Sequence, residues 1–284
     1  MGSKKKRLGA RRIRKVDVRK ALFVLPNLVT MASVFCGFNA MIVVARDNPT
    51  TDDFFRAAIL LTFSMLFDLL DGRVARMTRT QSAFGLQLDS LADVMSFGAA
   101  PSLLMYKWVL YNLQGGAFIA FFFTACGAAR LARFNVLSSG DSGTPVAPGK
   151  YVTGLPIPPA AGVLISLLLA NHAVGGALGA PENALAFAVV TAVLSLLMVS
   201  NIKFRSFKQV KFSMSTAIFV LFALGSSALV WRYSKPQFVL VWLLAFYVFI
   251  GLFEALRSLA KGRPAQPSTP VPPPTQPTTD ATAE

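Results

Sequence analysis

The chain has 284 residues, of which 54% are hydrophobic and 14% are charged, whereas about 25% of the residues of an ordinary soluble domain are charged. This composition excludes an ordinary soluble protein. The net charge of +15 could indicate a nucleic-acid partner, but ten of the 28 basic residues lie before residue 21, where they would bind the anionic inner face of a membrane. We therefore expect the lipid bilayer, and no nucleic acid, as the partner.

Eight apolar stretches follow one another along the chain, and each is long enough for a helix that crosses a bilayer, which needs about 20 residues. The predicted spans are residues 24–45, 54–72, 84–108, 115–135, 157–179, 183–202, 212–233 and 237–258. A basic leader at residues 1–20 precedes them, and a Pro- and Thr-rich tail at residues 261–284 should be disordered because it has little to bury. The predicted fold is an all-α integral membrane protein of about eight transmembrane helices, with its membrane domain at residues 21–260.

The basic side chains are shared unequally between the two sides of the predicted helices. If the N-terminus lies inside, five Lys and Arg lie outside, and these are Arg46, Arg56, Lys107, Arg232 and Lys235. Cytoplasmic loops of membrane proteins carry the excess of Lys and Arg. We therefore expect both termini on the cytoplasmic side of the cell (plasma) membrane.

Four acidic residues lie in the second and third predicted spans, where an unpaired carboxylate is costly. Asp68 and Asp71 end the second span, and Asp89 and Asp93 lie in the third. Spacings of three and four residues place each pair on one helix face, so a hairpin through residues 77–84 would bring the four carboxylates together at the cytoplasmic side. Four like charges call for cations, and oxygen ligands without nearby His or Cys favour Mg²⁺ or Mn²⁺ over zinc.

The residues between these acids suit a nucleotide diphosphate. Gly72 and Gly85 leave the helix backbone open to close approach. Ala75 keeps the same face shallow, and Arg76 offers a planar guanidinium to phosphate. Each glycine alone would more often be a helix-packing residue, but the set favours a phosphate site.

Residues 68–93 contain Asp-x-x-Asp-Gly-x-x-Ala-Arg, then eight residues, Gly, three residues, Asp, three residues and Asp. This pattern resembles, at every fixed position, the signature of the CDP-alcohol phosphatidyltransferases. The resemblance implies a six-helix core and two divalent metals, Mg²⁺ or Mn²⁺, held by Asp68, Asp71 and Asp89, with Asp93 as a metal-associated proton acceptor. It also implies a CDP-diacylglycerol site formed by Asn27, Thr30, Asp71, Gly72, Ala75, Arg76, Ser82 and Gly85.

Four further stretches resemble the family's phosphatidylserine synthase branch, and these are residues 35–38, 96–101, 129–135 and 154–160. This resemblance implies transfer of the phosphatidyl group from CDP-diacylglycerol to L-serine by direct displacement, with release of CMP and with Asp93 accepting the serine proton. A serine carboxylate could pair with Arg130 or Arg133. Ser96 is a further candidate for the serine site.

Several alternatives stay open. Arg130 and Arg133 could each simply anchor the fourth span at the lipid head groups. The acceptor could be glycerol 3-phosphate or an inositol phosphate, with Lys150, Lys203 and Arg205 as its cations. Acids inside helices could also belong to a divalent-cation transporter, although these four cluster at one end of their spans. Whether the protein forms a homodimer is open as well.

Overall fold

The computed structural model describes residues 18–78, 80, 82–138, 151–205, 226–227 and 237–260. Its helices are α1 (Val18–Ala45), α2 (Thr51–Thr78), α3 (Ala83–Asp93), α4 (Ala100–Trp108), α5 (Gly116–Ser138), α6 (Ile157–Ala173), α7 (Ala184–Val199) and α9 (Gln237–Ala260). The predicted all-α fold is confirmed. Most of the predicted leader, most of the predicted span at 212–233 and the whole predicted tail lie outside the described residues.

Three stretches of the described helices are long and apolar enough to cross a membrane, and these are Val24–Ala45, Gly116–Val136 and Pro181–Val199. Ile157–Ala173 and Phe238–Phe249 are apolar but shorter. α2, with 28 residues, has the length but carries charged residues toward both of its ends. The fold is that of an integral membrane protein, and the number of eight spans stays a prediction.

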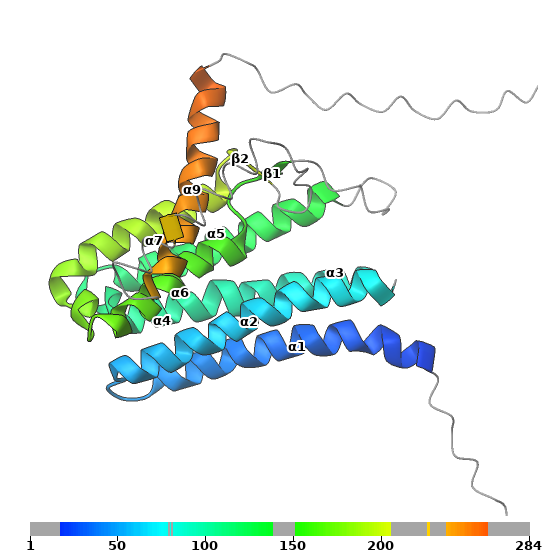
Figure 1. Cartoon of the computed structure of the whole chain (residues 1–284), viewed down its shortest axis with the longest axis horizontal. Helices are drawn as coiled ribbons and strands as arrows, with labels where there is room; N and C mark the ends of the chain where they lie inside the picture. Colours follow the sequence, from blue (N-terminus) through cyan, green and yellow to red (C-terminus); the bar gives the residue numbers. More distant parts are fainter. Residues whose placement is uncertain are drawn as a thin grey trace, which may run out of the picture.

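α1 and α2 form a long antiparallel pair along one side of the molecule (Figure 1). Thr50 caps α2, because its backbone N–H and its hydroxyl donate to the Asp53 carboxylate at 3.0 and 2.8 Å, and the Asp53 N–H donates back to Thr50 Oγ1 at 3.2 Å. These two bonds to the carboxylate lower the pKa of Asp53. The reciprocal cap explains why α2 begins at Thr51, before the predicted start at residue 54.

The third predicted span is helical throughout but is not a regular α-helix. α3 ends at Asp93, a π-helical turn follows at Val94–Ala99, and α4 continues from Ala100. The Ala100 N–H donates to the Met95 carbonyl, five residues back, so the turn accommodates one extra residue. Phe97, in the middle of the turn, is completely buried. Such turns are frequent at functional sites, and this one directly follows Asp93.

The core lies where α2, α4, α5, α6 and α7 meet. Its buried side chains include Leu61 of α2, Leu104 of α4, Phe123 of α5, Leu164 of α6 and Leu194 of α7. α9 packs on α6 and stands at a steep angle to α1 and α2 in Figure 1. Gly162 of α6 permits this packing, because a Cβ there would lie 3.2 Å from Met65 of α2 and 3.2 Å from Leu244 of α9.

The end of α6 differs from its prediction. α6 stops at Ala173, six residues before the predicted end at 179, because the next turn contains Gly175 and Gly176 with φ values of 68° and 90°, which favour glycine over a continued helix. Just before this end, His172 Nε2 lies 3.2 Å from Asp52 Oδ1 at the start of α2. This contact fastens the two helix ends that lie away from the four acids.

Two short strands, absent from the prediction, join the start of α6 to the end of α7. β1 (Tyr151–Thr153) pairs antiparallel with β2 (Lys203–Arg205), and the N–H of Gly154 donates to the Ile202 carbonyl at 2.8 Å. Gly154 has a φ of 78°, a conformation that glycine adopts at little cost. Strands of three residues are too short for an alternating pattern to reveal them.

Candidate active site

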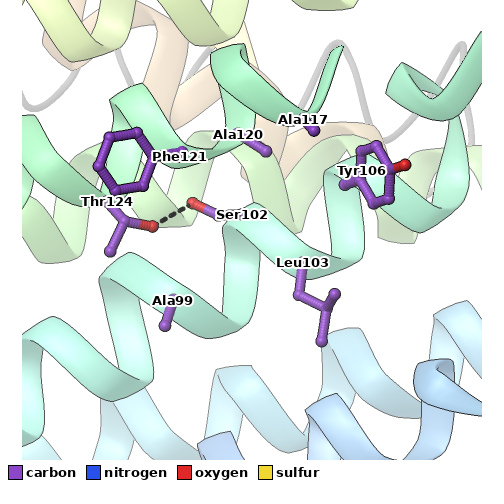
Figure 2. Close-up of a pocket in the computed structure, with 8 residues that line it drawn as sticks. All are labelled: Ala99, Ser102, Leu103, Tyr106, Ala117, Ala120, Phe121 and Thr124. Atoms are coloured by element: carbon purple, nitrogen blue, oxygen red, sulfur yellow. Dashed lines mark hydrogen bonds between the residues drawn. The ribbon is translucent and has the colours of Figure 1, made fainter. Parts of the chain in front are cut away.

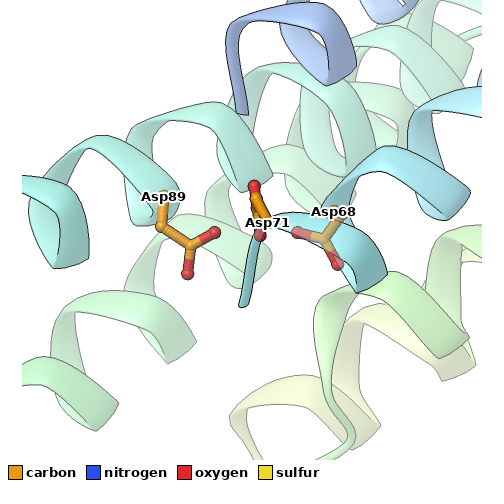
Figure 3. Close-up of side chains that lie close together, drawn as sticks. All are labelled: Asp68, Asp71 and Asp89. Atoms are coloured by element: carbon orange, nitrogen blue, oxygen red, sulfur yellow. The ribbon is translucent and has the colours of Figure 1, made fainter. Parts of the chain in front are cut away.

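Three carboxylates converge where α2 and α3 approach each other. Figure 3 shows Asp68 and Asp71 on α2 near Asp89 on α3, and one ligand atom from each side chain lies within 4.8 Å of the other two. α2 ends at Thr78 and α3 begins at Ala83, so the connection is the short hairpin that the acid spacing predicts. We call these three side chains the acid group.

Asp93 lies beside the acid group. Its side chain is 9% exposed, and its Oδ1 has no hydrogen-bond partner within the described part of the chain. Its side chain is hydrogen-bonded to that of Asp68, and the charges of Asp89 and Arg130 lie near it. A buried carboxylate oxygen without a partner is costly, so this oxygen is placed to accept a proton or to face a cation.

The donor set fits a hard divalent cation. Carboxylate oxygens are the ligands that Mg²⁺ and Mn²⁺ prefer, and the acid group includes neither His nor Cys. Carboxylates this close repel each other, and a cation removes that repulsion. The residues that would hold the cation are Asp68, Asp71 and Asp89, with the unpartnered oxygen of Asp93 alongside.

The predicted nucleotide ligands lie around the first turn of α3 and the last turns of α2. Ser82 caps α3, because its Oγ accepts the Gly85 N–H at 3.0 Å. A Cβ on Gly85 would lie 3.2 Å from Ser82 Oγ and 3.5 Å from Asn27 Oδ1, so α1 reaches the same turn. On α2, a Cβ on Gly72 would meet the Arg76 guanidinium at 3.7 Å and no other side chain of the described residues within 4 Å. The glycine therefore leaves open space beside Arg76.

Two predicted substrate ligands point into the protein instead. Thr30 is buried, and its hydroxyl donates to Asp71 Oδ2 at 2.7 Å. Ser96 is completely buried in the π turn, and its hydroxyl donates to the Ser33 carbonyl at 3.3 Å. Each hydroxyl therefore already has a hydrogen-bond acceptor in the protein.

Two polar residues near the site were missed in the sequence. Ser33 Oγ lies 2.8 Å from Ser64 Oγ, and each hydroxyl also lies close to the other residue's carbonyl oxygen, at 3.1 and 3.0 Å. Ser33 lies three residues after Thr30, and Ser64 four residues before Asp68. Both are hydroxyl residues inside apolar spans, and each lies three or four residues from a candidate ligand and so on the same helix face. This spacing is the signal that could have revealed them.

The two arginines of α5 have different surroundings. Arg130 is 9% exposed, its Cζ lies 5.4 Å from the centre of the Phe134 ring, and its Nε has no hydrogen-bond partner among the described residues. Its charge acts on Asp93. Arg133 is exposed and donates to Asn201 Oδ1 at 2.7 Å and to the Val199 carbonyl at 3.4 Å. Arg130 therefore lies buried near Asp93, whereas Arg133 caps the end of α7.

The two helices that carry the acid group also expose large apolar side chains. Leu69 and Met77 of α2 and Phe84 and Leu91 of α3 are each more than half exposed. In a membrane-spanning protein, such side chains face lipid chains of similar polarity. We call these four residues the apolar rim of α2 and α3.

A separate hollow lies between α4 and α5 (Figure 2). It has a volume of about 260 Å³ and is lined by Ala99, Ser102, Leu103, Tyr106, Ala117, Ala120, Phe121 and Thr124. The hydroxyls of Ser102 and Thr124 lie 2.8 Å apart and satisfy each other. The hollow contains no acid and is not part of the site described above.

The comparisons with known proteins agree with this geometry. A sequence model of the family described as CDP-alcohol phosphatidyltransferase matches residues 23–250. The CDP-diacylglycerol–serine O-phosphatidyltransferase of Helicobacter pylori is 35% identical over 241 residues, which are 84% of this chain and 94% of that protein. The enzyme of the same name from Mycobacterium tuberculosis is 29% identical over 84% of this chain and 79% of its own. Archaetidylserine synthase of Methanothermobacter thermautotrophicus is 33% identical over 65% of this chain and 70% of its own.

Proposed function

Because this chain belongs to the CDP-alcohol phosphatidyltransferase family, we propose that it transfers the phosphatidyl group of CDP-diacylglycerol to L-serine and releases CMP. The observation that carries the proposal is the acid group beside a buried Asp93, with the charge of the buried Arg130 nearby. Relatives named for this reaction match most of the chain. The membrane supplies the lipid substrate and takes up the lipid product.

Asp68, Asp71 and Asp89 would hold the divalent metals, two ions of Mg²⁺ or Mn²⁺, with Asp93 alongside. When bound, such ions neutralise charge on the pyrophosphate as it is cleaved. The nucleotide is assigned to the open space beside Gly72, where Arg76 can donate to phosphate. The remaining proposed contacts of the nucleotide are Ala75 of α2 and the turn formed by Asn27, Ser82 and Gly85.

Asp93 is proposed to accept the proton of the serine hydroxyl through its unpartnered Oδ1. As that proton moves, the serine oxygen forms a bond to the phosphorus that carries diacylglycerol. The bond from the same phosphorus to the CMP oxygen breaks, and its electron pair leaves with CMP. Direct displacement needs no covalent intermediate on the protein.

Arg130 is proposed to bind the serine carboxylate. Asp93 and Arg130 are both buried, act on each other electrostatically, and each keep one polar atom without a partner within the described chain. L-Serine carries a hydroxyl at one end and a carboxylate at the other, so it can satisfy both groups at once. Arg133, which caps α7, is left out of the serine site.

The acid group is proposed to face the cytoplasm of a cell whose plasma membrane holds the protein. The positive charge of the chain lies mainly on that side of the predicted spans. Both CMP and L-serine are soluble, and they would enter and leave from that side.

Purified protein incubated with CDP-diacylglycerol, Mn²⁺ and L-serine is expected to form phosphatidylserine and an equal amount of CMP. Glycerol 3-phosphate and an inositol phosphate should form no lipid product in parallel reactions. The lipid products are identified by mass spectrometry. Formation of a phosphatidylglycerol phosphate or a phosphatidylinositol phosphate in place of phosphatidylserine would overturn the assignment of the acceptor.

Substitution of Arg130 by Gln is expected to lower kcat/KM for L-serine about ten- to 100-fold, because a charge-assisted hydrogen bond to the carboxylate is lost. The KM for CDP-diacylglycerol should change little, because the nucleotide is assigned to α2 and α3. Steady-state kinetics with each substrate varied in turn measure both constants.

The matched control is Arg133→Gln, three residues along the same helix. Because Arg133 donates to Asn201 and to the Val199 carbonyl, this variant should lower the unfolding temperature and change kcat/KM for serine less than about threefold. If Arg130→Gln weakens the binding of CDP-diacylglycerol and leaves the binding of serine unchanged, Arg130 belongs to the phosphate site.

A further inference from the structure

The hydroxyl of Thr30 connects α1 to the acid group. It donates to Asp71 Oδ2 at 2.7 Å and lies 3.1 Å from the Pro26 carbonyl oxygen in its own helix. A hydroxyl has one proton, and the shorter distance together with the charge of the carboxylate favours the bond to Asp71. Thr30 and Asp71 are each 5% exposed, so water does not compete for this bond.

A second contact holds the same two helices, about one turn from Thr30 along α1 and about two turns from Asp71 along α2. Ser33 of α1 and Ser64 of α2 are buried, with their hydroxyls 2.8 Å apart. Two polar contacts along one helix pair fix both the rotation and the axial position of α2 relative to α1. The position of α2, which carries Asp71, is therefore fixed relative to α1. The Thr30 hydroxyl in turn orients the Asp71 carboxylate.

We propose that Thr30 is a positioning residue that holds the Asp71 carboxylate in the orientation in which it binds a divalent cation together with Asp68 and Asp89. This inference rests on the metal-binding part of the proposed function. Hydrogen-bonding partners behind a ligand restrict its orientation and strengthen metal binding. Thr30 contacts the proposed metal ligand Asp71, and its own side chain is buried.

The test is direct titration of the purified protein with Mn²⁺ in the absence of substrates, with free Mn²⁺ measured by electron paramagnetic resonance. Thr30→Val, which keeps the shape and removes the hydroxyl, should weaken Mn²⁺ binding about ten- to 100-fold. Thr30→Ser, which keeps the hydroxyl, should bind Mn²⁺ within about threefold of the wild type. Thr30→Ala provides a smaller variant without the hydroxyl and should behave as Thr30→Val does.

The matched control is Thr191→Val in α7. Thr191 is completely buried and donates to the Phe187 carbonyl four residues back at 2.8 Å, as Thr30 can to Pro26, but no residue of the acid group lies on α7. A merely structural loss would lower the unfolding temperature in both Thr→Val variants and leave Mn²⁺ affinity intact.

The outcomes separate the two proposals. If the wild type binds no Mn²⁺, the metal site of the proposed function is wrong. If the wild type binds Mn²⁺ and both Thr30→Val and Thr30→Ala bind it equally well, the role of Thr30 is wrong while the metal site stands. A raised KM for CDP-diacylglycerol with unchanged Mn²⁺ affinity would make Thr30 a nucleotide contact instead.

Discussion

Asp89→Asn is expected to abolish turnover and to weaken binding of Mn²⁺ or Mg²⁺. Asp89 is the contribution of α3 to the acid group, and its ligand oxygen lies within 4.8 Å of those of Asp68 and Asp71. An amide has nearly the same shape but carries no charge, so the attraction for a divalent cation falls while the repulsion among the acids is relieved. The variant should therefore fold at least as well as the wild type. Turnover is measured over a range of Mn²⁺ concentrations.

Asp52→Asn is the control for this substitution. Asp52 lies at the opposite end of α2, exposed and next to His172, so its amide variant should keep wild-type turnover. Undiminished activity of the wild-type protein in excess chelator, or of Asp89→Asn at every metal concentration, would contradict the metal site.

Asp93→Asn is expected to lower kcat by about 10²- to 10⁴-fold, the contribution of a general base. An amide cannot take up the proton of the serine hydroxyl. Because Asp93 lies beside the acid group and not among its three members, Mn²⁺ affinity should fall much less than in Asp89→Asn. Single-turnover measurements with saturating metal and serine isolate the chemical step.

Asp93→Glu serves as the comparison, since it keeps the carboxylate but moves it by one methylene. It should recover part of the lost rate. Full kcat in Asp93→Asn would show that another group accepts the proton, and equal losses of metal affinity in Asp93→Asn and Asp89→Asn would make Asp93 mainly a metal ligand.

The convergence of the acids was predictable because it depends on local geometry. Spacings of three and four residues fix which face of a helix a side chain occupies, and the few residues between Thr78 and Ala83 allow only a tight hairpin. Asp68, Asp71 and Asp89 therefore meet as their spacing requires.

The roles of the two arginines could not be separated in this way. Arg130 and Arg133 lie three residues apart, so their directions around α5 differ by only about 60°. Which of them faces Asp93 depends on the rotation of α5, and packing against other helices sets that rotation. Gly127, one turn before Arg130, is where Ile157 of α6 packs against α5.

The π turn and the inward direction of Thr30 also depend on contacts distant in sequence. A π turn shifts the hydrogen-bond partner by one residue, and the residues at 94–99 carry no local signal for that shift. Here a Cβ on Gly37 of α1 would lie 2.9 Å from Ser96 Oγ, so the turn is accommodated by a neighbouring helix. Thr30 likewise meets Asp71 across 41 positions of sequence, beyond the reach of periodicity.

The apolar rim has a consequence for the choice of lipid. Leu69, Met77, Phe84 and Leu91 are exposed on α2 and α3, the helices that carry the acid group. The hydrocarbon tails of a substrate that contacts these helices therefore move from lipid chains to apolar side chains. Transfer between two hydrocarbon surroundings yields almost no free energy, because no water is released from either. Selectivity must then come from the polar end of the molecule, and tails that differ in length, saturation or branching should be accepted about equally well.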